Sequence, residues 1–178
     1  MTDELVRDAI ASVGDPEYPD VSIVDLGLLE SVDVAGRVVG VGLVPTFSGC
    51  PALHMIAADV RSAVEAVPGI DECHVTWLDA PAWTTDRMTG GAVRALSDDY
   101  TVVLRDESGG LTCPVCGSAA VADRSMAGPT RCRSIAWCPD CRNPVEVMRT
   151  DPSPSVPVRL GVNPERSGPH RRHSEVVA

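Results

Sequence analysis

The sequence predicts an α+β fold: a small sandwich of a three-stranded or larger sheet with helices on one face, followed by a zinc-ribbon module. Apolar residues in the first part of the chain follow the order helix, strand, strand, helix, strand. Two C-x-x-C pairs lie in the second part. With 178 residues, 44% of them hydrophobic and 3% aromatic, the chain can fill one ordinary domain with an aliphatic core and add a small module.

The first helix begins at the N-terminus. Thr2 can cap it, two acidic residues follow in the first turn, and apolar residues recur at helical spacing up to Gly14. Residues 15–20 contain two prolines and three acidic residues, so this segment should be an irregular loop.

Two strands should follow. Residues 21–29 are mostly apolar, with Asp25 and Gly27 embedded among them. Residues 29–34 alternate, Ala35 and Gly36 can turn, and residues 37–44 are rich in valine. This pattern predicts a β-hairpin.

The second helix should occupy residues 51–67, because apolar residues form one stripe there. Pro51 suits the first helical position, and the Pro68-Gly69 pair ends the helix. Residues 73–78 then predict a third strand. A short helix is expected around residues 88–96, although Gly90 and Gly91 weaken it.

We predict three segments: residues 1–105 as the first domain, residues 106–150 as the zinc-ribbon module and residues 151–178 as a disordered tail. Residues 106–110 have the composition of a linker. The last segment contains five prolines, scattered arginines and few apolar residues.

Charge excludes some partners. Of the net charge of −10, residues 1–112 carry −13 (19 acidic and 6 basic residues), whereas residues 113–150 carry +2 and the remainder +1. An acidic main body argues against nucleic acid or an anionic membrane as principal partner. No signal peptide or apolar run of 18 residues is evident, and seven cysteines suit a reducing compartment, so we expect a soluble, cytoplasmic protein.

Four cysteines predict a metal site in the second module. Each C-x-x-C pair places two thiolates on a tight turn, and together the pairs close a tetrahedral site for structural zinc; an Fe–S cluster or a single iron is the alternative. The predicted ligands are Cys113, Cys116, Cys138 and Cys141. Cys132, a fifth thiol in this module, is either a small buried residue or a spare ligand or redox contact.

Cys50 stands where the second strand gives way to the second helix. In the first turn of a helix, free N–H groups and the macrodipole favour a thiolate, although a cysteine there can also serve as a small hydrophobe. Thr46 offers a hydroxyl nearby, and His54 lies one helical turn further on. Asp25, between two apolar residues, should be hydrogen-bonded, at an exposed strand end, or functional.

No conventional catalytic set emerges. The sequence contains no lysine, which excludes Schiff-base chemistry and a P-loop lysine. Nucleophile elbows, H-E-x-x-H and dinucleotide or phosphate glycine loops are absent as well. The residues alone therefore indicate a thiol-presenting α+β domain with a metal-stapled appendage.

Several motifs together resemble a known family. They are DPE at 15–17, SIVDLGL at 22–28, PTFSGCP at 45–51, PAWTTD at 81–86, CPVCGS at 113–118, GPTRC at 128–132 and CPDC at 138–141. In this order they resemble the PaaD family of the phenylacetyl-CoA epoxidase system, a branch of the SufT-like iron–sulfur assembly family. The resemblance covers roughly residues 1–149.

The resemblance implies a non-catalytic accessory of a multicomponent oxygenase that helps to assemble or insert Fe–S clusters. Cys50 matches the family's characteristic cysteine and Asp25 its characteristic acid, so Cys50, Asp25 and Thr46 are the candidates for a labile cluster site. Transient cluster binding beside structural zinc is implied. Oxygenase or reductase subunits are the implied partners, and a second copy of the chain can meet the first at Cys50. The client and pathway, phenylacetate catabolism or secondary metabolism, stay open.

Two other functions stay open at this point. The ribbon can be a docking module for an oxygenase subunit, with an incidental Cys50. Alternatively, Cys50 can transfer acyl groups from a thioester, which requires a base such as His54 beside it.

Overall fold

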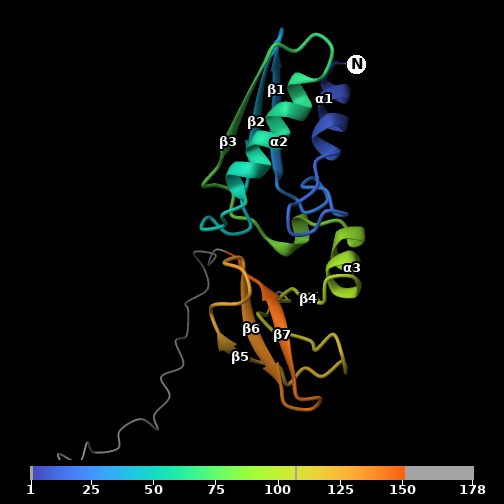
Figure 1. The fold of residues 1–178 in the computed structure, drawn as a ribbon, viewed down its shortest axis with the longest axis vertical. Helices are drawn as coiled ribbons and strands as arrows, with labels where there is room; N and C mark the ends of the chain where they lie inside the picture. The colour runs from blue at the N-terminus through green and yellow to red at the C-terminus, as the bar shows by residue number, and fades with distance from the viewer. Residues whose placement is uncertain (1, 107, 151–178) are drawn as a thin grey trace, which may run out of the picture.

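The computed structural model describes residues 2–106 and 108–150. The first module contains a three-stranded sheet, made of β1 (Leu29–Ala35), β2 (Val38–Leu43) and β3 (Glu72–Trp77). Two helices, α1 (Thr2–Ala11) and α2 (Leu53–Glu65), lie side by side against this sheet (Figure 1). The predicted α+β sandwich is confirmed. The tail predicted for residues 151–178 lies outside the described residues.

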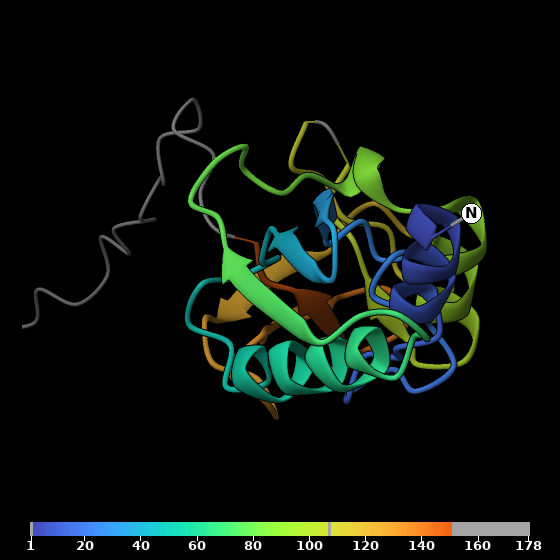
Figure 2. The same cartoon turned by 90° about the horizontal axis from the view of Figure 1, so that it is seen from above.

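The strand order is β1-β2-β3, with β1 antiparallel to β2 and β2 parallel to β3. Gly36 makes the β1–β2 turn with a φ of 67°, which an L side chain rarely adopts. The parallel pairing requires a long connection, and α2 provides it. Figure 2 shows α2 running along one face of the sheet, directly beneath β3.

The core between sheet and helices is aliphatic, as composition predicts. The sheet contributes Val39, Val41 and Leu43, and the predicted stripe of α2 contributes Ile56, Val60 and Val64; all six are at most 2% exposed. Each such side chain stabilises the fold by roughly 1.5–3 kcal/mol through burial.

Residues 21–28 form turns rather than extended strand. The Ser22 hydroxyl accepts the Asp25 N–H at 3.0 Å and donates to the Asp25 carboxylate at 2.8 Å, and Gly27 has a φ of 73°. Such local bonds offer the backbone an alternative to a sheet ladder. Of the three alternatives that the sequence left open for Asp25, the structure shows the hydrogen-bonded one, and a functional role stays untested.

The segment after β3 closes over these turns. Trp83 is buried, and its indole N–H donates to the Leu26 carbonyl at 2.9 Å. The predicted short helix exists as α3 (Gly90–Asp98), preceded by a 3₁₀ turn, η1 (Thr85–Arg87). Thr89 caps α3 by accepting the Ala92 N–H at 3.2 Å, which offsets the poor helix propensity of two glycines.

A second sheet forms the ribbon. Its strands β4 (Val102–Val103), β5 (Ala122–Ser125), β6 (Arg133–Cys138) and β7 (Asn143–Met148) lie in the order β4-β7-β6-β5. All neighbours are antiparallel except β4 and β7. Since β4 precedes residue 106 yet pairs with β7, it ties the predicted first domain to the ribbon.

The two modules share a core at their junction. Val102 of β4 and Met148 of β7 are buried in the same apolar cluster as the helices and sheet of the first module. A separate, smaller cluster lies inside the ribbon. In the described part of the chain, no helix is both long and apolar enough to cross a membrane.

Candidate functional site

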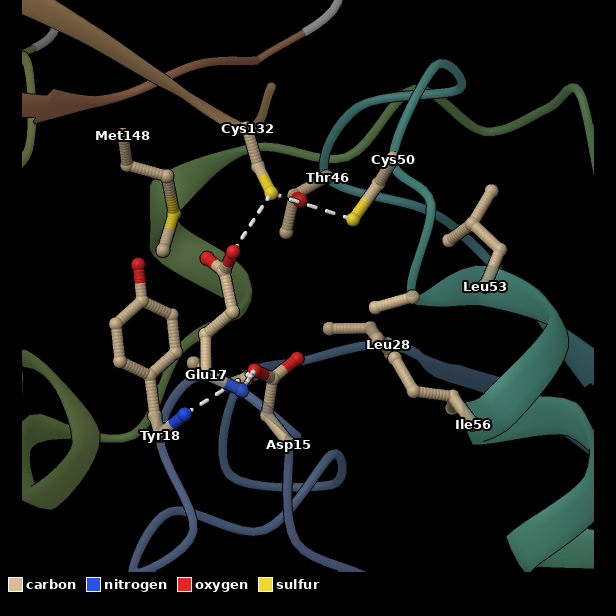
Figure 3. A pocket seen from close by; sticks show the side chains of 12 residues that line it. Asp15, Glu17, Tyr18, Leu28, Thr46, Cys50, Leu53, Ile56, Cys132 and Met148 are labelled. Atoms are coloured by element: carbon tan, nitrogen blue, oxygen red, sulfur yellow. Dashed lines mark hydrogen bonds between the residues drawn. The ribbon is translucent and has the colours of Figure 1, made fainter. Parts of the chain in front are cut away.

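A pocket lies at the junction of the two modules (Figure 3). Acidic residues from the loop after α1 form one side, Thr46 and Cys50 from the β2–α2 loop form another, and Cys132 and Met148 of the ribbon close it. Apolar side chains of α2 and of residues 26–28 form its floor. The lining residues are Asp15, Glu17, Tyr18, Leu26, Leu28, Thr46, Cys50, Ala52, Leu53, Ile56, Cys132 and Met148.

Cys50 precedes α2 instead of lying in its first turn. The helix begins at Leu53 with Ala52 as N-cap, two residues later than Pro51 predicts. A tight turn comes first, in which the Cys50 N–H donates to the Phe47 carbonyl at 3.1 Å. The Ala52 backbone, at the helix entrance, contributes to lowering the pKa of Cys50, so the start of the helix still favours the thiolate.

The ribbon places a second thiol beside Cys50. The Sγ atoms of Cys50 and Cys132 lie 3.3 Å apart, within hydrogen-bond distance for sulfur. Cys132 is 7% exposed, whereas Cys50 is half-buried. The Thr130 hydroxyl lies 3.7 Å from the Cys132 sulfur. Cys132 is thus buried, as one interpretation of the sequence had it, and it also contacts a second thiol, so a role as ligand or redox contact stays a prediction.

This pair has unequal acidity. The hydrogen bond with Cys132 lowers the pKa of Cys50 to about 7, against burial, and the Ala52 N–H adds to the effect. The same interaction and burial raise the pKa of Cys132, and the nearby Glu17 carboxylate adds to this. Cys50 is therefore the more acidic thiol of the pair and the one that ionises first.

Asp15 organises the acidic side of the pocket. Its carboxylate accepts the N–H groups of Glu17 at 2.8 Å and Tyr18 at 3.3 Å, which fixes the turn, and burial raises its pKa. One Glu17 oxygen then lies 3.4 Å from the Cys132 sulfur. The DPE motif thus directs a carboxylate at the thiol pair.

Arg133 balances this negative charge. Its Nε lies 3.7 Å from the second Glu17 oxygen, and its Nη1 donates to Glu146 at 2.7 Å. The guanidinium also lies over the Tyr18 ring, 5.2 Å from the centroid. Among the described residues, Arg133 Nε is the one buried side-chain polar atom without a hydrogen-bond partner. Arg133 joins the ribbon to the acidic loop.

The structure brings together only some of the predicted site residues. Thr46 lines the pocket with Cys50 (Figure 3). Asp25 is not among the lining residues; its carboxylate accepts the Thr89 hydroxyl at 3.1 Å, and its carbonyl accepts the Thr89 N–H at 2.9 Å. These bonds tie the 21–28 turns to the start of α3, and a ligand role for Asp25 stays a prediction. His54 is exposed and also outside the pocket.

The four predicted zinc ligands converge in the ribbon. The sulfurs of Cys113, Cys116, Cys138 and Cys141 all lie within 4.8 Å of one another, with pairs at 3.5 and 3.6 Å. A tetrahedral metal with 2.3 Å bonds to sulfur requires separations of about 3.8 Å, so the donor set fits one such ion. Cys138 ends β6 and Cys132 precedes it, which places this site about 20 Å from the pocket.

Sequence reasoning missed the pairing of Cys50 with Cys132 and the role of Glu17. The two cysteines are 82 residues apart and belong to different modules. The DPE motif at 15–17 and the GPTRC motif at 128–132 mark these residues, but their spacing in the sequence does not predict that the two segments are in contact.

Comparison with known proteins matches both modules. Residues 3–77 match the model of the iron–sulfur cluster assembly protein family, and residues 97–149 match that of the PaaD zinc beta ribbon domain. A domain of unknown function, DUF59, from Bacillus anthracis has a similar solved structure. It has a TM-score of 0.51 and 29% identity, covering 55% of this chain and 92% of that one.

Curated relatives agree. A protein of Escherichia coli (strain K12) that is named as a 1,2-phenylacetyl-CoA epoxidase component is 31% identical over 150 residues, which are 79% of this chain and 88% of that protein. An Fe-S protein maturation auxiliary factor of Porphyromonas gingivalis is 38% identical over 54% of this chain and 91% of its own length. The chain therefore belongs to the PaaD family, in which an iron–sulfur cluster assembly domain is followed by a zinc beta ribbon.

Proposed function

We propose that this protein is an accessory maturation factor of a multicomponent oxygenase of the phenylacetyl-CoA epoxidase type, and that it assists iron–sulfur cluster assembly or insertion. Cys50 is the labile thiolate ligand. The observation that carries this proposal is the place of Cys50: a half-buried thiol, with a pKa lowered to about 7, at a pocket between the two modules.

The chemistry of the pocket suits transient binding. A thiolate is the form of cysteine that binds iron, and an open position lets a client protein reach it. Because a cluster needs four protein ligands, a pocket with fewer thiolates holds it weakly. Weak, incomplete coordination favours transfer to a client over storage.

A non-catalytic role fits the same pocket. The lining residues of the described chain include no histidine, and the Glu17 carboxylate is engaged by Arg133 and the Cys132 thiol. The described lining therefore offers no Cys–His pair of the kind that thiol-dependent acyl transfer uses.

Zinc is the metal that we assign to the ribbon. Four thiolates and no open position are typical of structural zinc, which contributes on the order of 10 kcal/mol or more to folding of a small module. The residues Cys113, Cys116, Cys138 and Cys141 would hold the ion and close the ribbon around its small core.

The partners follow from the relatives. One relative is named as an epoxidase component and others as Fe-S maturation factors. We propose that oxygenase or reductase subunits of such a system are the clients, in a reducing, cytoplasmic compartment that keeps the cysteines as thiols.

The test is client maturation in cells that carry Cys50→Ser. We expect the iron and sulfide content of the client to fall while the variant keeps its fold and its zinc. Cys73→Ala is the matched control, because Cys73 is buried on β3, away from the pocket. Full client occupancy with Cys50→Ser would contradict the proposal and favour a role in docking alone.

A further inference from the structure

We propose that Cys50 and Cys132 together form a two-thiolate site for iron, so that the ribbon supplies the second ligand of the labile site. This inference rests on the proposed function and deepens it. The first module presents Cys50, and the segment before β6 presents Cys132, which the zinc site does not use.

The sulfur separation carries the argument. At 3.3 Å, the two Sγ atoms are slightly closer than the roughly 3.8 Å between two thiolates on one tetrahedral metal ion. A small outward movement of either side chain therefore opens the pair around an ion. Cys50 is half-buried and faces the pocket, so the ion has an entry path that Cys132 alone would not give.

The proton balance is simple. Before binding, the hydrogen bond between the two sulfurs holds one proton, so the pair counts as one thiol and one thiolate. Binding of Fe²⁺ forms two iron–sulfur bonds and breaks the remaining S–H bond, so one proton is released and no electron is transferred. That proton is released to solvent, which reaches the pair from the half-buried Cys50 side of the pocket.

The surroundings limit the site to two protein thiolates. Asp15 is occupied by the N–H groups of its own turn, and Glu17 by Arg133. Among the described residues, the four ribbon cysteines form a group of ligating side chains within 4.8 Å of one another. The pocket residues do not form such a group. The remaining coordination positions of the iron are left to sulfide and to the client.

Two thiolates are half of the ligand set of a [2Fe–2S] cluster, which takes four cysteines. The chain therefore holds one iron of such a cluster by a complete pair and leaves the other iron to the client or to a second copy. A chelating pair binds more firmly than one thiolate, since the second bond forms within the same molecule.

Anaerobic titration with Co²⁺ tests the pair. The full-length chain is first loaded with one zinc per ribbon, which Co²⁺ does not readily displace because zinc binds such sites more tightly. Added Co²⁺ is then followed by its sulfur-to-cobalt charge-transfer absorption. Cys50→Ser, Cys132→Ser and the control Cys73→Ala are compared, with zinc content and circular dichroism as checks of folding.

We expect one added Co²⁺ per wild-type and Cys73→Ala chain. Either pocket variant should bind it roughly 10²-fold more weakly, as expected for loss of a chelate. Reconstitution with iron and sulfide should give the same ranking in the visible spectrum.

Two results separate the claims. Wild-type binding by Cys132→Ser, with loss in Cys50→Ser, would overturn the two-thiolate site and leave Cys50 as a single ligand, so the proposed function would stand. Wild-type binding by both variants would overturn this inference and remove the chemical basis of the proposed function.

Discussion

The guanidinium of Arg133, at the start of β6, lies 3.7 Å from the Glu17 carboxylate. This contact links the ribbon to the loop after α1. Both side chains are largely buried, with 14% and 20% exposed. Arg133 also bonds Glu146, so its removal would leave two carboxylates without their cation.

Arg133→Leu should therefore destabilise the junction by about 2–3 kcal/mol, less than a fully buried pair because some solvent reaches the groups. Urea unfolding followed by circular dichroism measures the change. The control is Arg105→Leu, which removes an exposed ion pair to Asp123 and should cost about 0–1 kcal/mol. Equal losses in the two variants would show that Arg133 has no special role at the junction.

Alkylation of Cys50 should depend on pH with a midpoint near 7. Its pKa is lowered to about 7, so the thiol is mostly protonated and slow below that pH, and the rate should rise towards a plateau above it. Iodoacetamide labelling of the zinc-loaded protein, read by peptide mass spectrometry, measures the profile.

Cys132→Ala removes the hydrogen-bond donor that contributes most to this shift. The midpoint should then move up towards the ordinary cysteine pKa of about 8.5. A profile that stays near 7 in this variant would assign the shift to the helix entrance at Ala52 instead.

The ribbon should contain about one zinc ion per chain, and Cys138→Ser should release it. Loss of metal-coupled folding energy, on the order of 10 kcal/mol, should unfold β5 to β7 while α2 and its sheet persist. Elemental analysis and hydrogen exchange distinguish the modules. A folded ribbon without metal would contradict the structural role of zinc.

Trp83→Phe should cost about 1–2 kcal/mol, because the buried Leu26 carbonyl loses its indole donor while the ring stays packed. The loss should appear as faster exchange in residues 21–28. The matched control is Trp77→Phe, because Trp77 is a half-buried tryptophan on β3. This variant should leave the exchange rates of residues 21–28 unchanged. Unchanged exchange in Trp83→Phe would mean that packing alone holds these turns.

Local patterns predicted much of this fold. The apolar stripe of α2 and the spacing of the ribbon cysteines each reflect neighbours a few residues apart, which a sequence displays directly. The apolar composition of residues 21–28 did not reveal their turns, which depend on the Ser22–Asp25 bonds and on the positive φ of Gly27. Strand β4 has only two residues, too few for an alternation of apolar and polar side chains. Its parallel pairing with β7 could therefore not be predicted.

The sequence predicted Cys50 as a site residue but not its contact with Cys132. Cys50 stands in a local motif, whereas its partner is brought close by docking of another module. Asp25 carried the same family signal as Cys50, yet its bonds to Ser22 and Thr89 are those of a residue that fixes a turn. A site formed by contacts between distant segments leaves no local pattern in the sequence.

Strand β6 lies between two cysteines. Cys138 at its end belongs to the four-cysteine metal site, and Cys132, just before its start, lies beside Cys50. If the ribbon folds only around the metal that we assign to it, its near end is not held in place before the far end is loaded. Under the proposed function, zinc acquisition would then come first in assembly and presentation of the paired thiols second. Zinc supply in the cell would then set how many copies are competent to handle iron.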